Sequence, residues 1–272
     1  RWFMMADRRL QAMCLVLVLL VSTIAAPASA QAEDPKQPSV DNPHMHFWGT
    51  SQLDQCWTHF DGNDSAGSAS EGYGEETFPE GQQVEVDFSC QMQENLKQDM
   101  YLDANGTIRF EFVVSIWSAD DCDDSSQECI PLTFTLMKGN TEIAKQEFPS
   151  VNKDGDDEML QWTLNTNETM ASWNRSIEEP TIHVQFSWPG YTDIFCGWLT
   201  DCTGHFRFYY SNNEDNDTVE VNFPVINHTI PGQGGNDDGL IEGVGDKLPG
   251  FGLVAALGAL AMAAIANTRR EH

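Results

Sequence analysis

The sequence predicts an all-β fold, an antiparallel β-sandwich of the immunoglobulin-like or jelly-roll kind. Two observations predict it. Apolar and polar residues alternate with a period of two through most of residues 44–230, and turn-forming residues separate the alternating runs. A strand with one apolar face must bury that face against another layer, so we expect about eight strands in two packed sheets.

Each alternating run predicts a strand with one buried face. In chain order the runs cover residues 84–90, 107–117, 131–148, 159–164, 181–188, 205–210 and 218–225. The run over 131–148 is predicted to be a hairpin, because Gly139 and Asn140 interrupt it as a tight turn would. Residues 167–179 come nearest to a helical spacing, and we expect one short helix there at most.

The first thirty residues have the layout of a secretory signal peptide. Arg8 and Arg9 precede an apolar run over 15–21, and small residues at Ala28 and Ala30 predict cleavage before Gln31. An N-terminal membrane anchor is the alternative, which the short apolar run disfavours.

The rest of the chain divides by composition. Residues 31–43 are polar and rich in proline, which predicts an unstructured leader, and 44–230 form the expected ectodomain. Within it, 61–76 are predicted to be a long mobile loop. Residues 231–248 are typical of a flexible stalk, and 249–272 form a hydrophobic tail expected to be helical.

Six cysteines remain after removal of the signal peptide, and an even number in an exported chain indicates three disulfide bonds. Two pairs are close in sequence, which favours one pairing. It joins Cys56 to Cys90, Cys122 to Cys129 and Cys196 to Cys202. A cysteine-ligated metal is the alternative, which the absence of any Cys-x-x-Cys disfavours.

The chain carries a formal net charge of −28, which excludes nucleic acid and anionic lipid surfaces as partners. Six Asn-x-Ser/Thr sequons exceed the number that chance would give and predict glycosylation of an exported protein. The acceptor asparagines are Asn63, Asn105, Asn167, Asn174, Asn216 and Asn227.

No motif predicts an enzyme. The sequence lacks Gly-x-Ser-x-Gly, His-Glu-x-x-His and a glycine-rich phosphate loop, and the predicted disulfides leave no free thiol outside the signal peptide. We therefore expect no catalytic residue and no cofactor beyond weakly bound Ca²⁺.

Two segments are candidates for metal binding. His44 and His46 would point the same way on a strand and could hold a metal ion with His59 or His205. The alternative is a strand whose histidines face solvent. The second segment has oxygen ligands at positions 3, 5, 7 and 9 of an EF-hand-like loop but lacks the glutamate at position 12, so a polar turn competes with weak Ca²⁺ binding. Its ligands would be Asn152, Asp154, Asp156 and Glu158.

The tryptophans are expected mainly in the core, because aromatic side chains bury the most area. The alternative is a carbohydrate-binding surface module that uses exposed rings as stacking platforms. Its candidates are Trp48, Trp57, Trp198 and Tyr191. The ligand itself is not predicted.

The C-terminus carries three elements in order: Pro249-Gly250-Phe251, an apolar run over 252–266, and the pair Arg269 and Arg270. This order resembles the archaeal PGF-CTERM sorting signal. The resemblance implies that an archaeosortase-like membrane enzyme recognises Pro249, Gly250 and Phe251, removes the tail and leaves the protein attached to a lipid. With Phe251 included, the apolar residues 251–266 number 16 and would span about 24 Å as a helix, short of a hydrocarbon core of about 30 Å. The sequence thus predicts an archaeal exoprotein anchored at the outer face of the cell membrane, with a structural, adhesive or ligand-binding role.

Overall fold

The structure is a computed structural model, and it describes residues 34–122, 128–198 and 201–227. This part of the chain is all-β, as the sequence predicts, and contains no helix. Residues 167–179, which come nearest to a helical spacing, form no helix, and turns and the two-residue strand β10 (Ser172–Trp173) occupy that segment. No helix among the described residues has the length and apolarity that a membrane crossing requires.

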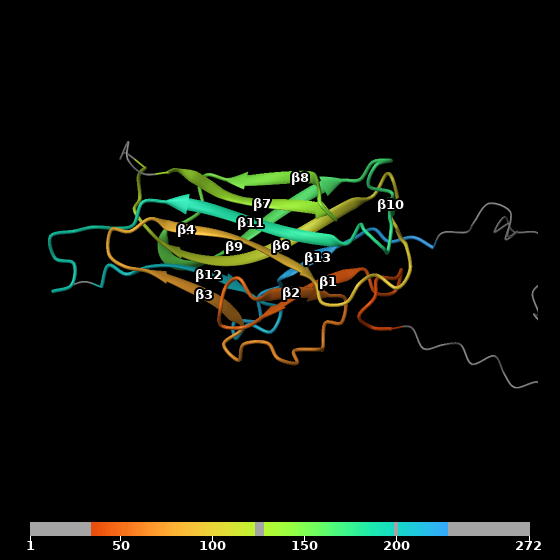
Figure 1. The fold of residues 1–272 in the computed structure, drawn as a ribbon, viewed down its shortest axis with the longest axis horizontal. Coiled ribbons are helices and arrows are strands. Elements are labelled where there is room, and N and C mark those ends of the chain that lie inside the picture. The colour runs from red at the N-terminus through yellow and green to blue at the C-terminus, as the bar shows by residue number, and fades with distance from the viewer. Residues whose placement is uncertain (1–33, 123–127, 199–200, 228–272) are drawn as a thin grey trace, which may run out of the picture. The chain divides into compact units, whose positions relative to one another are not determined.

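Most strands belong to one sheet with two antiparallel parts (Figure 1). Their bounds are β1 (His44–Gly49), β2 (Cys56–His59), β3 (Tyr73–Phe78), β4 (Val84–Met92), β6 (Thr107–Trp117), β7 (Ile130–Lys138), β8 (Thr141–Phe148), β9 (Asp154–Asn165), β11 (Pro180–Trp188), β12 (Gly204–Tyr209) and β13 (Glu220–Asn222). A separate pair is formed by β5 (Met100–Tyr101) and β10.

The first part of the sheet is built around β6. Strand β9 pairs along one edge of β6. On the other edge, β13 pairs with residues 109–111 of β6 and β12 pairs with residues 114–117. Beyond β12 lies β3, and beyond β13 lie β1 and β2. The second part runs β4-β11-β7-β8, and its β7–β8 hairpin turns at Gly139 and Asn140 as expected.

The two parts meet at a short parallel pairing between β2 and β4. Only Trp57 with Gln91 and Thr58 with Met92 are in register there. The prediction of a purely antiparallel arrangement is therefore wrong at this junction. The cause is that β3 intervenes between β2 and β4, so the chain enters β4 in the direction of β2.

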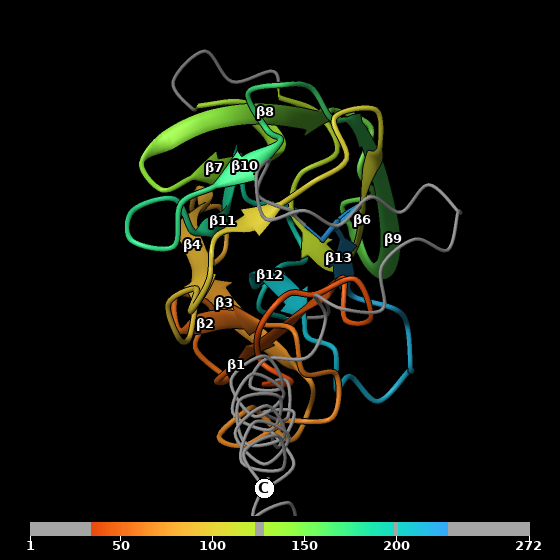
Figure 2. The same ribbon diagram turned by 90° about the vertical axis from the view of Figure 1, so that its right-hand side faces the viewer.

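The core lies between the inner faces of the two parts, which the end-on view shows on either side of a common interior (Figure 2). Phe112 of β6 stacks on Phe134 of β7 with ring centroids 4.1 Å apart, although these strands are not sheet neighbours. The faces predicted to be inward are confirmed. Their buried residues are Val84, Val86, Phe88, Ile108, Phe110, Phe112, Val114, Ile116, Ile182, Val184, Phe186, Phe206, Phe208, Tyr210, Val219, Val221 and Phe223.

Three disulfides join the cysteines in the predicted pairs: Cys56–Cys90, Cys122–Cys129 and Cys196–Cys202. The first links β2 to β4 next to their parallel pairing, with Cα atoms 4.9 Å apart. It therefore fastens the junction between the two parts of the sheet.

Residues 34–43, which are the described part of the predicted unstructured leader, dock onto the body. The Lys36 ammonium lies 2.5 Å from the carboxylate of Asp64, and the buried Gln37 accepts a 2.7 Å hydrogen bond from the backbone N–H of Lys97. A polar segment can dock through hydrogen bonds without an apolar face, which composition does not reveal. The predicted signal peptide over 1–30, the stalk over 231–248 and the tail over 249–272 lie outside the described residues.

Candidate functional site

A set of imidazole and carboxylate side chains lies on the outer face of β1 and β13. Glu220 of β13 is directly opposite His46 of β1, and His44 is two residues away on the same face. The Nδ1 atom of His44 is 2.7 Å from one oxygen of Glu220, and Nδ1 of His46 is 3.9 Å from the other. One carboxylate thus serves two imidazoles. Glu220 could not be predicted as their neighbour, because periodicity shows which face a residue occupies and not its partner across the sheet.

The other two predicted histidine ligands are arranged differently. His59 is opposite His46 on β2, but its Nδ1 accepts a hydrogen bond from the backbone N–H of Asp61 and its Nε2 faces Asp64 at 3.7 Å. His205 lies apart on β12, where its Nε2 is 3.4 Å from the hydroxyl of Ser115. The structure therefore gathers His44, His46 and Glu220, with His59 beside them and His205 elsewhere.

Burial lowers the pKa of the His46 imidazole, while the negative charge of Glu220 acts in the opposite direction. Burial also lowers the pKa of His59, helped by the positive charge of Lys36. Among the described residues, no three or more histidine, cysteine or acidic side chains are already arranged around one metal position. Any ion at β1 would have to draw its ligands together.

The EF-hand-like segment forms the start of β9: Asn152 lies just before the strand, and Asp154, Asp156 and Glu158 lie within its first five residues. The Oδ1 atom of Asn152 accepts the N–H of Asp154, Oδ1 of Asp154 accepts the N–H of Asp156, and a Glu158 oxygen accepts the N–H of Asn152. These backbone donors engage oxygens that a calcium ion would need. The turn predicted for this segment is thus replaced by the beginning of a strand, and weak Ca²⁺ binding stays a prediction.

Ser115 and His205 are a serine–histidine pair of the kind used in nucleophilic catalysis. The hydroxyl of Ser115 is fully buried, however, and donates a 2.7 Å hydrogen bond to the carbonyl of Gly155. A substrate carbonyl could not reach it, so we assign this pair a role in packing β6 against β9 and β12.

The loop between β11 and β12 exposes a group of apolar side chains, here called the apolar tip and defined as Ile194, Phe195 and Trp198. Their exposed fractions are 90%, 44% and 78%. The Cys196–Cys202 disulfide closes the loop, and the carboxylate of Asp193 accepts the backbone N–H of Phe195. The backbone is thus held by turns while the side chains face solvent.

Of the four rings considered as carbohydrate platforms, Trp198 is exposed and Trp48 is not. Trp48 is 2% exposed and stacks on His59 with ring centroids 5.5 Å apart, so its ring is covered and cannot serve as a platform. Trp57 and Tyr191 are partly buried. Sequence reasoning missed Ile194 and Phe195, although two adjacent apolar residues in a turn-rich segment were a usable signal.

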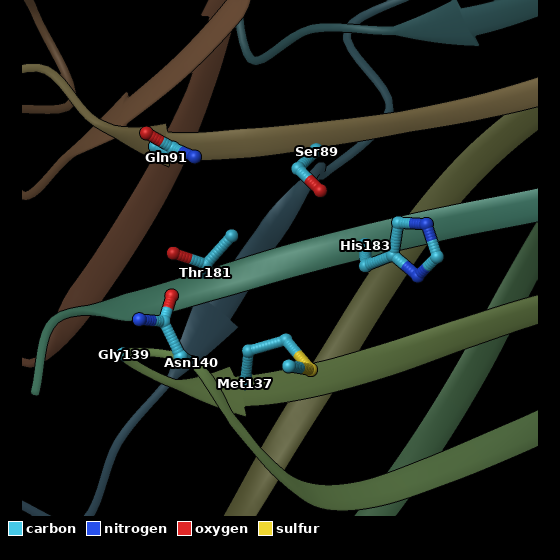
Figure 3. Close-up of a pocket in the computed structure, with 7 residues that line it drawn as sticks. All are labelled: Ser89, Gln91, Met137, Gly139, Asn140, Thr181 and His183. Atoms are coloured by element: carbon cyan, nitrogen blue, oxygen red, sulfur yellow. The ribbon is translucent and has the colours of Figure 1, made fainter.

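A shallow groove of about 310 Å³ crosses the outer face of β4, β11 and β7 (Figure 3). Its lining is neutral hydroxyl and amide side chains with one imidazole and one thioether. The lining residues are Ser89, Gln91, Met137, Gly139, Asn140, Thr181 and His183. Nε2 of His183 lies 2.7 Å from the carboxylate of Asp87 on β4. This is a pair of one imidazole and one carboxylate, unlike the two imidazoles beside Glu220.

The comparisons with known proteins do not assign a family. No family model and no curated protein matches the chain. Among solved structures, a chain of the T13 IBDV viral particle matches with 9% identity and a TM-score of 0.23, covering 73% of this chain. This chain spans about 55% of that chain's length, and a likeness at this TM-score carries no argument about fold or function.

Proposed function

We propose that the protein is a surface-anchored archaeal exoprotein, with an ectodomain of the β-sandwich class, that recognises a ligand or another cell surface through its apolar tip. The observation that carries the proposal is the exposure of Ile194, Phe195 and Trp198 on a disulfide-closed loop. Monomeric proteins rarely leave neighbouring large apolar side chains in water without a partner to cover them.

The position of the apolar tip supports a role in recognition. The loop between β11 and β12 projects from one end of the described body, away from the segment that follows β13 (Figure 1). The C-terminal resemblance to PGF-CTERM signals supports anchoring at the membrane, with Pro249, Gly250 and Phe251 as the recognition motif.

Two further observations support export. Three disulfides are consistent with an oxidising location outside the cell. All six sequon asparagines are exposed, and none lies within a strand, so each could accept a glycan without disturbing the sheet.

Carbohydrate is the second candidate for what the apolar tip binds. Trp198 presents an indole ring that is 78% exposed, and aromatic rings of this kind stack on the apolar faces of sugars. The phenolic hydroxyl of Tyr191 and the carboxylate of Asp193 lie in the same loop and supply polar groups.

The test replaces the apolar tip in the full-length protein on its own cells. Ile194→Ser, Phe195→Ser and Trp198→Ser together should abolish adhesion between cells, or the binding of a glycan panel, while the protein level at the surface stays unchanged. Ile177→Ser is the matched control, because Ile177 is 72% exposed and lies in a different loop. Equal adhesion and glycan binding by the triple variant and wild type would contradict the proposal.

A further inference from the structure

We propose that His44, His46 and Glu220 bind one divalent transition-metal ion of the Zn²⁺ class on the outer face of β1 and β13. The inference is independent of the apolar tip, which belongs to the loop between β11 and β12. It replaces the third ligands suggested by sequence, His59 and His205, with a residue that only the strand pairing reveals.

The strand register supplies the ligands. In an antiparallel pair, directly opposite side chains share a face, and so do residues two apart on one strand. His46 and Glu220 are opposite each other, and His44 is two residues from His46. The side chains of His46 and Glu220 are each 19% exposed and that of His44 is 40% exposed, so the set is sheltered and still reachable from solvent.

The distances suit an ion after movement of the side chains. In a tetrahedral site with bonds of about 2.0–2.1 Å, neighbouring ligand atoms lie about 3.3–3.4 Å apart. Nδ1 of His44 lies 2.7 Å from Oε1 of Glu220, and Nδ1 of His46 lies 3.9 Å from the other oxygen, Oε2, so the two distances lie on either side of that value. The two imidazole rings are stacked with their centroids 6.4 Å apart, so both side chains would have to move to bring their nitrogens and the carboxylate around one ion.

The loop over His46 fixes which nitrogen can serve. A Cβ atom at Gly62 would lie only 2.9 Å from Nε2 of His46, so the loop covers that side of the ring closely and tolerates only a glycine there without movement. Nδ1 is therefore the nitrogen directed toward Glu220.

The ligand chemistry selects the class of ion. Two imidazoles and one carboxylate suit Zn²⁺ and its neighbours such as Cu²⁺ and Ni²⁺, whereas Ca²⁺ and Mg²⁺ prefer an all-oxygen set. Three protein ligands leave a fourth position for water or an outside ligand. The net charge of −28 would raise the local concentration of cations around the protein.

The test is calorimetric titration of the full mature protein with ZnCl₂, with thermal unfolding as the second readout. We expect one equivalent of Zn²⁺ to bind and to raise the Tm, and a millimolar excess of Ca²⁺ to leave both unchanged. Glu220→Gln and His44→Ala should each weaken Zn²⁺ binding by about 10-fold or more, since loss of even an outer ligand partner costs that much.

His183→Ala is the matched control. It removes a histidine that contacts Asp87 at the same 2.7 Å distance, without a second imidazole on that carboxylate. We expect this variant to bind Zn²⁺ as the wild type does. Absence of Zn²⁺ binding at millimolar concentration, or an equal loss in His183→Ala, would overturn the proposal. Wild-type affinity in folded Glu220→Gln would overturn it as well.

Discussion

At the scale of single residues, Gly139 shows how one position holds a hairpin. Its φ is +57°, in the left-handed region, and a Cβ atom there would lie 2.1 Å from the carbonyl oxygen of Ile177. The sequence identified the turn from Gly139-Asn140, but the approach of the chain at Ile177 comes from a distant segment that no local pattern reveals.

Gly139→Ala should therefore lower the free energy of unfolding by about 2–4 kcal/mol, through backbone strain and the clash together. Gly67→Ala is the matched control. Its φ is +81°, but nothing lies within 4 Å of the added Cβ, so only the strain of about 1 kcal/mol should appear. Chemical denaturation of both variants measures the difference, and equal losses would contradict the role assigned to the Ile177 contact.

His205 makes stability depend on pH. Burial lowers its pKa, and the charge of Arg207 lowers it further, while Glu75 and Asp157 act in the opposite direction. The unfolded chain takes up a proton on this imidazole near pH 6.5, whereas the folded protein resists protonation until a lower pH. The folded state therefore loses stability as the pH falls below about 6.5.

His205→Gln should reduce the fall in unfolding free energy between about pH 7 and pH 5, because the variant has no imidazole to protonate. Urea denaturation at several pH values in this range measures the slope for wild type and variant. His46 and His59, whose pKa values are also lowered by burial, should leave a residual slope. An unchanged slope in His205→Gln would show that this imidazole is not the group responsible.

At the scale of elements, alternation predicted which faces are buried and not which strands are neighbours. The inward residues of β4, β6, β11, β12 and β13 follow from a period of two. The parallel pairing of β2 with β4, and the pairing of Glu220 with His46, depend on contacts between segments far apart in the chain. A residue's own strand carries no signal for its partner, which is why the histidine site was only half predicted.

The Cys56–Cys90 disulfide should contribute more stability than Cys196–Cys202. The first closes a separation of 34 residues and joins β2 to β4, and the second closes 6 residues within a loop. Loop-closure entropy gives about 4 kcal/mol for the longer loop and about 2 kcal/mol for the shorter one. Double serine variants of each pair should differ in this order in guanidinium denaturation. A greater loss for the short loop would contradict the role of Cys56–Cys90 at the sheet junction.

At the scale of the whole molecule, an acidic chain with three disulfides presents six exposed sequon asparagines outside its strands. Composition alone gave the charge and the number of sequons, but not their exposure. The packing of β6 and β12 against β4 and β7 explains how strands with one apolar face each form a closed core. Loops on such a scaffold can vary in sequence without disturbing the core, and the apolar tip lies in one of these loops.

The central claim is that this chain is exported, oxidised and anchored at the cell surface. Intact mass of the protein purified from its own cells tests that claim most directly. We predict the mass of a chain that begins at Gln31, carries glycans and lacks the segment from Pro249 onward. Alkylation without a reductant should not change this mass. A mass that retains residues 1–30, together with six cysteines that alkylate freely, would contradict it.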